Sequence, residues 1–148
     1  MKTIHIYIDG ACRNNQASEN LGAYAYKLIY GDKLKTFAQV VPNTTNNRME
    51  LLGAISAFEA LNRPCEVSFC SDSKYVIDGL SKGWAEGWKK KGWKKGDGKP
   101  ALNPELWDRL LSLCDKHEVE FVWVKGHAGH PENERCDQLA TAFADSFN

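Results

Sequence analysis

The sequence predicts an α/β fold in which a five-stranded mixed sheet, three antiparallel strands and then two parallel ones, carries helices on both faces. Three β-rich segments with short links open the chain, which is typical of an antiparallel meander. Two further strand segments then alternate with amphipathic helices, which predicts parallel strands joined by crossovers. Neither an internal repeat nor an interdomain linker interrupts the 148 residues, so we expect a single domain over 1–148.

The first three strands are bounded by turn residues. Residues 3–8 alternate in β-rich side chains and stop at Asp9-Gly10, which predicts a strand that ends in a turn. Residues 23–30 and 34–41 alternate in the same way, and Gly31-Asp32 between them is typical of a hairpin.

The rest of the chain alternates helices with short apolar strands. Capping residues at Thr44-Thr45-Asn46 and at Ser71-Asp72-Ser73 predict two helix starts, and Asn103-Pro104 predicts a third. The expected elements are a helix that ends near 62, a strand at 66–70, a helix that ends near 80, a helix from 104 through 113, a strand at 119–124 and a helix at 132–144.

The charges cancel over the whole chain but not along it. Nineteen basic and nineteen acidic residues give a formal net charge of zero, and that balance alone argues against a nucleic-acid partner. Residues 82–99, however, hold seven lysines and two acidic residues, a net charge of +5. The other 130 residues therefore carry a net charge of −5, so the neutrality is a cancellation.

The same basic segment holds three of the five tryptophans, Trp84, Trp88 and Trp93. Trp84 and Trp88 are i,i+4 neighbours if the segment is helical. Lysines interleaved with indole rings can bind phosphates while the rings pack on sugars or bases, which favours nucleic-acid contact. The alternative is that the rings pin the segment to the body, and both roles are compatible.

Cysteine usage and hydropathy bear on location. The five cysteines are odd in number and unpaired in spacing, and the N-terminus resembles no secretion signal, so we expect reduced thiols in a cytoplasmic protein. No run approaches the roughly 18 apolar residues that span a bilayer, so we expect no membrane segment.

Four carboxylates stand at the ends of predicted strands or early in predicted helices. Asp9 and Asp72 follow the first and fourth strands and would meet at one end of the sheet if these strands are neighbours. Glu50 shares a helix stripe with apolar residues, which is costly unless it is paired or bound to a metal. Asp137 lies early in the last helix. Each carboxylate also has a structural alternative. Asp9 could belong to a turn and Asp72 could cap a helix. Glu50 could lie at the solvent edge of its helix, and Asp137 could stabilise a helix dipole.

A converging set of carboxylates would suit magnesium, which prefers oxygen ligands and bridges to phosphates. Two such ions can activate a water and stabilise the departing oxygen in a displacement at phosphorus. His127 lies in a glycine-flanked loop, where an imidazole could shuttle protons near neutral pH. The alternative for His127 is a solvent-exposed histidine in a flexible loop.

These segments together resemble the type 1 ribonuclease H proteins of the bacterial kind, which carry a basic handle. The resemblance runs essentially end to end, and six matching stretches in the same order make it specific. The matching stretches are 6–12, 44–51, 71–76, 88–94, 125–130 and 133–140.

The resemblance implies an endonuclease that hydrolyses the RNA strand of an RNA–DNA hybrid by a two-metal-ion mechanism, leaving 5′-phosphate and 3′-hydroxyl ends. It implies Asp9, Glu50, Asp72 and Asp137 as metal ligands for two Mg²⁺ ions when substrate is bound, with Mn²⁺ as a substitute, and His127 as an aid to proton transfer or product release. A monomer is expected, and residues 82–99 would be the handle that grips the hybrid. The implied substrate contacts are Cys12, Asn15, Asn46, Asn47, Lys74, Trp84, Trp88, Lys89, Lys90, Lys91 and Trp93.

Two departures from the family pattern stand out, and two alternative functions are weighed against the nuclease. The loop at 13–21 is polar and free of glycine, so either Asn14 or Asn15 would take the groove-reading place, with Asn15 favoured. Lys74 stands where glutamine is frequent. A noncatalytic hybrid-binding module would gain nothing from clustered carboxylates, and a DNA-directed enzyme of the same fold, such as a resolvase or integrase, is disfavoured by Asn46-Asn47 and the handle.

Overall fold

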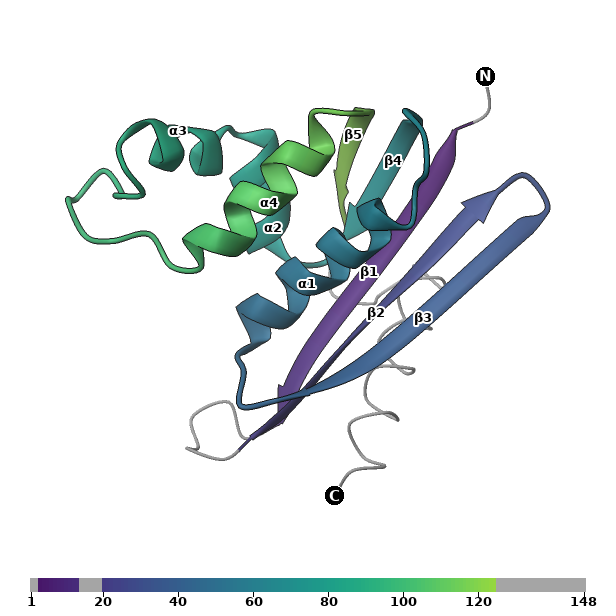
Figure 1. The fold of residues 1–148 in the computed structure, drawn as a ribbon, viewed down its shortest axis with the longest axis horizontal. Coiled ribbons are helices and arrows are strands. Elements are labelled where there is room, and N and C mark those ends of the chain that lie inside the picture. Colours follow the sequence, from purple (N-terminus) through teal and green to yellow (C-terminus); the bar gives the residue numbers. More distant parts are fainter. Residues whose placement is uncertain (1–2, 14–19, 125–148) are drawn as a thin grey trace.

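The five strands form one mixed sheet in the order β3-β2-β1-β4-β5. Figure 1 shows this arrangement in a computed structural model, which describes residues 3–13 and 20–124. The first three strands pair antiparallel, and β4 pairs parallel with both β1 and β5, as the sequence predicts. The strand bounds are β1 Ile4–Arg13, β2 Leu21–Tyr30, β3 Lys33–Pro42, β4 Glu66–Ser71 and β5 Glu118–Trp123.

Four helices accompany the sheet in the described part of the chain. Helix α1 packs across β1 and β2, and α4 lies beside α1 (Figure 1). None of the helices within 3–13 and 20–124 has the length and apolar character needed to cross a membrane. The predicted last helix at 132–144 lies outside the described residues. The helix bounds are α1 Asn46–Glu59, α2 Lys74–Ser81, α3 Trp84–Lys90 and α4 Pro104–Cys114.

Both predicted helix caps form. The Thr45 hydroxyl accepts a hydrogen bond from the Arg48 backbone N–H at 3.2 Å and starts α1. The Ser73 hydroxyl accepts one from the Val76 N–H at 3.3 Å and starts α2. Each bond satisfies one of the backbone donors that a helix leaves open at its start, so local chemistry fixes where α1 and α2 begin.

The predicted turn at Asp9-Gly10 is wrong, because β1 continues through both residues to Arg13. Gly10 is needed there for a different reason. A Cβ at this position would lie 2.6 Å from the Met49 carbonyl carbon and 2.7 Å from the Glu50 nitrogen. Distances below 3 Å are not tolerated between such atoms, so glycine lets the first turns of α1 lie directly on β1.

Buried side chains lie on both faces of the sheet. Trp107, Phe58 and Phe69 are the largest in the main core, where the rings of Phe58 and Phe69 stack with centroids 5.5 Å apart. Tyr26 of β2 joins this core, whereas the adjacent Ala25 belongs to a second buried cluster. Because alternate residues of a strand face opposite sides, both faces of β2 are covered, as the predicted fold class requires.

His117 links two connections at the edge of the core. Its Nδ1 accepts a hydrogen bond from the Cys65 backbone N–H at 3.0 Å, and its ring packs near Phe58. Burial, reinforced by the charge of Lys116, lowers the pKa of His117 below its usual value. Protonation at Nδ1 would remove the acceptor, so the neutral form belongs to the folded state.

This predicts a loss of stability in mild acid. Below the unfolded-state pKa of about 6.5 the unfolded chain binds the proton more readily, so the free energy of unfolding falls as the pH drops. A His117→Asn variant keeps an acceptor that does not titrate. Urea midpoints at about pH 7.5 and about pH 5.5 should show a larger decrease for the wild type than for the variant. Equal decreases would remove His117 as the cause.

Candidate metal centre and nucleic-acid interface

Asp9 lies in β1, and Asp72 comes directly after the end of the neighbouring parallel strand β4. Tyr7 of β1 is in register with Cys70 of β4, and the two aspartates are two residues further along each chain. The expectation that they share one region of the sheet is therefore confirmed. Asp9 is 2% exposed, and it lies inside β1 instead of at its end.

Glu50 reaches the same place from α1. It is 9% exposed, so the expectation that it lies on the buried side of the helix is confirmed and the solvent-edge alternative is wrong. The contact of Gly10 with the backbone of Met49 and Glu50 explains its position, since it holds this turn of α1 against β1 beside Asp9.

The three carboxylates form one cluster, which we call the carboxylate cluster: Asp9, Glu50 and Asp72. One carboxylate oxygen of each lies within 4.8 Å of those of the other two. Bringing three acidic groups so close together, in a site where Asp9 is buried and Asp72 is half-buried, is unfavourable unless positive charge compensates them. Their oxygens are the donors that hard divalent cations prefer, so the residues fit a metal such as Mg²⁺. Asp137 and His127 lie outside the described residues.

Trp123 and Lys74 flank the third member of the cluster. The Trp123 indole N–H donates a hydrogen bond to the Asp72 backbone carbonyl at 3.1 Å. The Lys74 ammonium lies 4.6 Å from the centroid of the Trp123 ring. This arrangement fixes the backbone at Asp72 and keeps a positive charge nearby. Sequence reasoning missed Trp123, whose only signal was its place at the end of the last strand.

A second group of polar residues surrounds the start of α1. Asn46 and Asn47 are exposed in its first turn. Just before them, Thr44 exchanges two hydrogen bonds with the Asn20 side chain, at 2.7 and 2.9 Å. The Cys12 thiol also contacts the Thr44 carbonyl, at 3.5 Å, and burial raises the pKa of Cys12.

The structure therefore brings Cys12 to the same connection that precedes Asn46 and Asn47. Sequence reasoning did not assign Asn20 a role, and no motif marks it. Asn15 lies outside the described residues.

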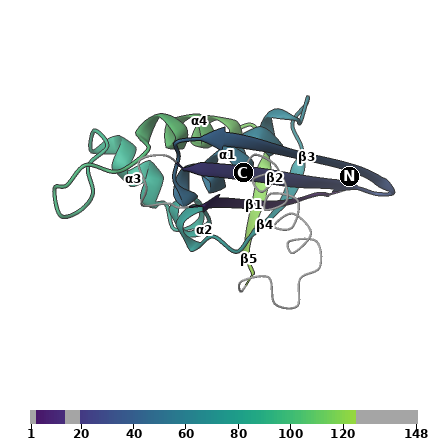
Figure 2. The same cartoon turned by 90° about the horizontal axis from the view of Figure 1, so that it is seen from below.

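The handle, residues 82–99, contains α3 and a loop that extends to one side of the molecule, at the opposite end from the β2–β3 turn (Figures 1 and 2). Its tryptophans differ in exposure. Trp84 is 47% exposed, with the Lys82 ammonium 5.3 Å from its ring centroid. Trp88 and Trp93 are half-buried, and Trp88 packs edge-on against Trp107 with centroids 5.9 Å apart. Both roles considered for the tryptophans therefore have a structural basis.

The lysines of the handle divide in the same way. Lys89 forms a 2.7 Å ion pair with Asp108 of α4, and this hydrogen bond raises the pKa of Lys89. Lys90 and Lys91 are exposed. Lys89 thus helps to tie the handle to the body, while the next two lysines are available to a ligand.

Beyond α3 the handle closes on itself. Lys94 and Pro100 form an isolated antiparallel bridge, and the Lys95 N–H donates to the Lys99 carbonyl at 2.9 Å. The three lysines of this small loop are exposed. In the sequence these lysines are only part of a basic segment. In the structure, the backbone pairing of residues 94–100 forms the turn that holds them at the surface.

Comparison with known proteins shows which family the chain is similar to. A family model described as RNase H matches residues 1–145. Proteins named ribonuclease H from Rhizobium meliloti and Desulforamulus reducens are 54% and 49% identical over 147 and 148 residues, which cover 99% and 100% of this chain and 94% and 91% of theirs. A crystal structure of LC9-RNase H1, titled a type 1 RNase H with the type 2 active-site motif, superposes with a TM-score of 0.82 at 32% identity, covering 100% of this chain and 74% of that one.

Proposed function

The chain belongs to the ribonuclease H family, and on that premise we propose that it hydrolyses the RNA strand of RNA–DNA hybrids by a two-metal-ion mechanism, leaving 5′-phosphate and 3′-hydroxyl ends. The observation that carries the proposal is the convergence of Asp9, Glu50 and Asp72 from three separate elements, with carboxylate oxygens within 4.8 Å of one another. A protein that only bound nucleic acid would be hindered by this negative charge beside phosphates.

The carboxylate cluster, completed by Asp137, would hold Mg²⁺, two ions when a hybrid is bound, with Mn²⁺ as a substitute. Bound ions would supply an activated water and stabilise charge on the departing oxygen. The chain's own contribution is position: β1 and β4 set the level of two carboxylates, and the Gly10 contact brings the third. His127 would move a proton at the leaving group or assist product release.

The substrate would lie along the exposed start of α1 and the handle. Asn46 and Asn47, together with Cys12 and Asn15, would read the minor groove, where 2′-hydroxyls distinguish RNA from DNA. Lys74 would contact a phosphate near Asp72. Trp84, the exposed side of Trp88, Lys90 and Lys91 would hold the DNA strand, and Lys89 and Trp93 would support them.

We further propose that the protein acts as a monomer of one domain in the cytoplasm, where its cysteines stay reduced. Sedimentation of the protein without hybrid should give the mass of one chain. A dimer at micromolar concentration would contradict this part.

The most direct test offers the full chain four labelled substrates: RNA–DNA hybrid, duplex RNA, duplex DNA and single-stranded RNA. Each is incubated with magnesium, manganese or EDTA. We expect cleavage only of the RNA strand in the hybrid, and only with a divalent metal. Binding without cleavage would indicate a noncatalytic module, and cleavage of duplex DNA would indicate a related nuclease of another specificity.

The exposed handle lysines provide a further prediction. Changing Lys90 and Lys91 to alanine should weaken hybrid binding in EDTA about tenfold and reduce the slope of log affinity against log salt by about one or two, since each lysine neutralises about one phosphate. Lys33→Ala with Lys35→Ala, at the opposite end of the molecule, is the matched control for lost charge. If both double variants lose affinity equally, the handle has no special part in binding.

A further inference from the structure

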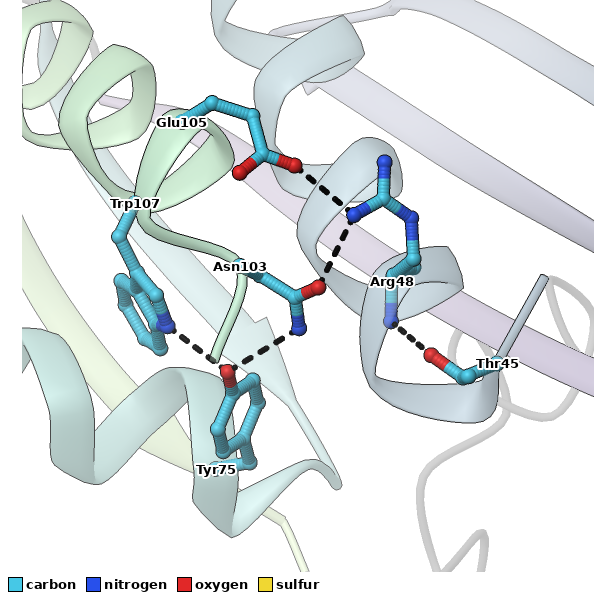
Figure 3. Close-up of polar contacts among 6 residues, drawn as sticks. All are labelled: Thr45, Arg48, Tyr75, Asn103, Glu105 and Trp107. Carbon is cyan, nitrogen blue, oxygen red and sulfur yellow. Dashed lines mark hydrogen bonds and ion pairs between the residues drawn. The ribbon is translucent and has the colours of Figure 1, made fainter. Parts of the chain in front are cut away.

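Arg48 connects the first turn of α1 with the segment that follows the handle. Its Nη1 donates hydrogen bonds to the Asn103 side-chain carbonyl at 3.0 Å and to a Glu105 carboxylate oxygen at 2.9 Å (Figure 3). The bond to Arg48 lowers the pKa of Glu105, in keeping with an ion pair. Arg48 therefore bridges α1 to the start of α4.

The same network continues to α2. The Asn103 side-chain NH₂ donates to the Tyr75 hydroxyl at 3.4 Å, and the Trp107 indole N–H donates to that hydroxyl at 2.8 Å (Figure 3). Tyr75 is three residues after Asp72, and Arg48 is two residues before Glu50. One set of side chains thus joins the helices that follow, or carry, two members of the carboxylate cluster.

Asn103 is also where the handle returns to the body. It adopts the left-handed conformation at φ 57°, which asparagine tolerates better than most residues. Behind it, the Ala101 N–H donates to the Trp93 carbonyl at 2.9 Å, and the Trp93 N–H donates to the Trp88 carbonyl at 2.7 Å. A continuous series of contacts therefore runs from α3 through Asn103 to Arg48.

We propose that Arg48 is a positioning residue that holds the handle in register with the carboxylate cluster, so that a hybrid gripped by the handle presents its RNA strand to Asp9, Glu50 and Asp72. The inference rests on the proposed function. Stability alone is a poor explanation of the bridge, because the side chains of Arg48 and Glu105 are 37% and 59% exposed, and exposed ion pairs contribute little to folding.

The chain offers a matched control for this bridge. Arg109 forms an ion pair with Glu59, which also joins α1 and α4 through an exposed arginine and glutamate. That pair lies near the C-terminal end of α1, whereas Arg48 lies at its start beside the handle exit. Loss of either bridge should cost a similar small amount of stability, but only the loss of Arg48 should affect the handle.

The test is a double-mutant cycle on hybrid affinity in EDTA. Lys90→Ala with Lys91→Ala should weaken binding about tenfold in the wild type but no more than about threefold in Arg48→Ala, because a handle out of register contributes less. In Arg109→Ala the loss should remain about tenfold. Tyr75→Phe, which keeps the ring and removes the hydroxyl, should reduce the handle's contribution as Arg48→Ala does.

Steady-state cleavage with magnesium supplies a readout that a stability role would not move. Arg48→Ala should raise KM and leave kcat within about twofold, since saturating hybrid offsets a weakened grip. A fall in kcat would overturn the proposal by showing that Arg48 acts on the carboxylates. If the Lys90 and Lys91 substitutions reduced hybrid affinity equally in the wild type and in Arg48→Ala, the proposal would be overturned while the proposed function stayed intact. If the wild type neither bound nor cleaved hybrid, the proposed function itself would fail.

Discussion

Asp9→Asn is expected to lower magnesium-dependent cleavage of the hybrid at least about 1,000-fold, since losing about 4 kcal/mol of transition-state stabilisation has that effect. Asp9 is 2% exposed, and one of its carboxylate oxygens lies within 4.8 Å of those of Glu50 and Asp72, so the substitution removes a charged oxygen from the cluster itself. Asparagine keeps the shape of the side chain, so β1 and its pairing with β2 should be unchanged. Single-turnover cleavage of a labelled hybrid measures the effect.

Two companion measurements separate lost chemistry from lost structure. In EDTA, Asp9→Asn should unfold at the same or a higher temperature than the wild type, because one of three clustered negative charges is gone. Magnesium should then stabilise the wild type more than the variant. Asp32→Asn makes the same chemical change in the exposed β2–β3 turn and should cleave normally. Robust magnesium-dependent cleavage by Asp9→Asn would refute the assignment of the carboxylate cluster.

Gly10→Ala is expected to give the largest loss of stability among the proposed changes, about 2 to 3 kcal/mol in the free energy of unfolding. The added methyl would lie 2.6 Å from a backbone carbon of Met49 and 2.7 Å from the Glu50 nitrogen, and backbone atoms cannot rotate away. Helix α1 must therefore shift from β1 and take Glu50 with it. A displacement of about 1 Å at a reacting group can cost about 100-fold in rate, so kcat should fall as well.

Gly53→Ala is the matched control, because Gly53 lies on α1 and faces β1 and β2 across the same helix–sheet contact. A methyl there would have its nearest neighbours at 3.6 Å, which is ordinary contact. Alanine is also favoured over glycine inside a helix by about 0.5 to 1 kcal/mol, so the variant should be as stable as the wild type or more so. Urea unfolding measures both variants. If Gly10→Ala were as stable as Gly53→Ala, the close approach of α1 and β1 would not set the site.

Local signals were sufficient for most of the architecture. Hydroxyl caps at Thr45 and Ser73 and the hairpin at Gly31-Asp32 act within a few residues, so the sequence predicts where elements begin and end. The turn predicted at Asp9-Gly10 failed because the reason for Gly10 is distant in the sequence. Its neighbour is Met49, and only the folded chain brings the two together.

The candidate site shows the same division. The carboxylates could be proposed from strand ends and from the buried stripe of α1, and the family resemblance agreed with that set. The sequence could not predict which side chains of the handle anchor it and which stay exposed, because this depends on contacts with α4. Trp88 packs against Trp107, and Lys89 forms an ion pair with Asp108. A count of lysines and tryptophans cannot distinguish a side chain that anchors the segment from one that remains exposed.

The central claim, that ions held by the carboxylate cluster act at the scissile phosphate, is tested most directly by replacing each non-bridging oxygen at one cleavage position with sulfur. Sulfur is a poor partner for magnesium and a better one for the softer manganese. We predict that at least one substitution slows cleavage in magnesium and that manganese restores the rate, while Asp9→Asn shows no such rescue. Equal rates with oxygen and sulfur in magnesium, or equal losses in both metals, would contradict the account.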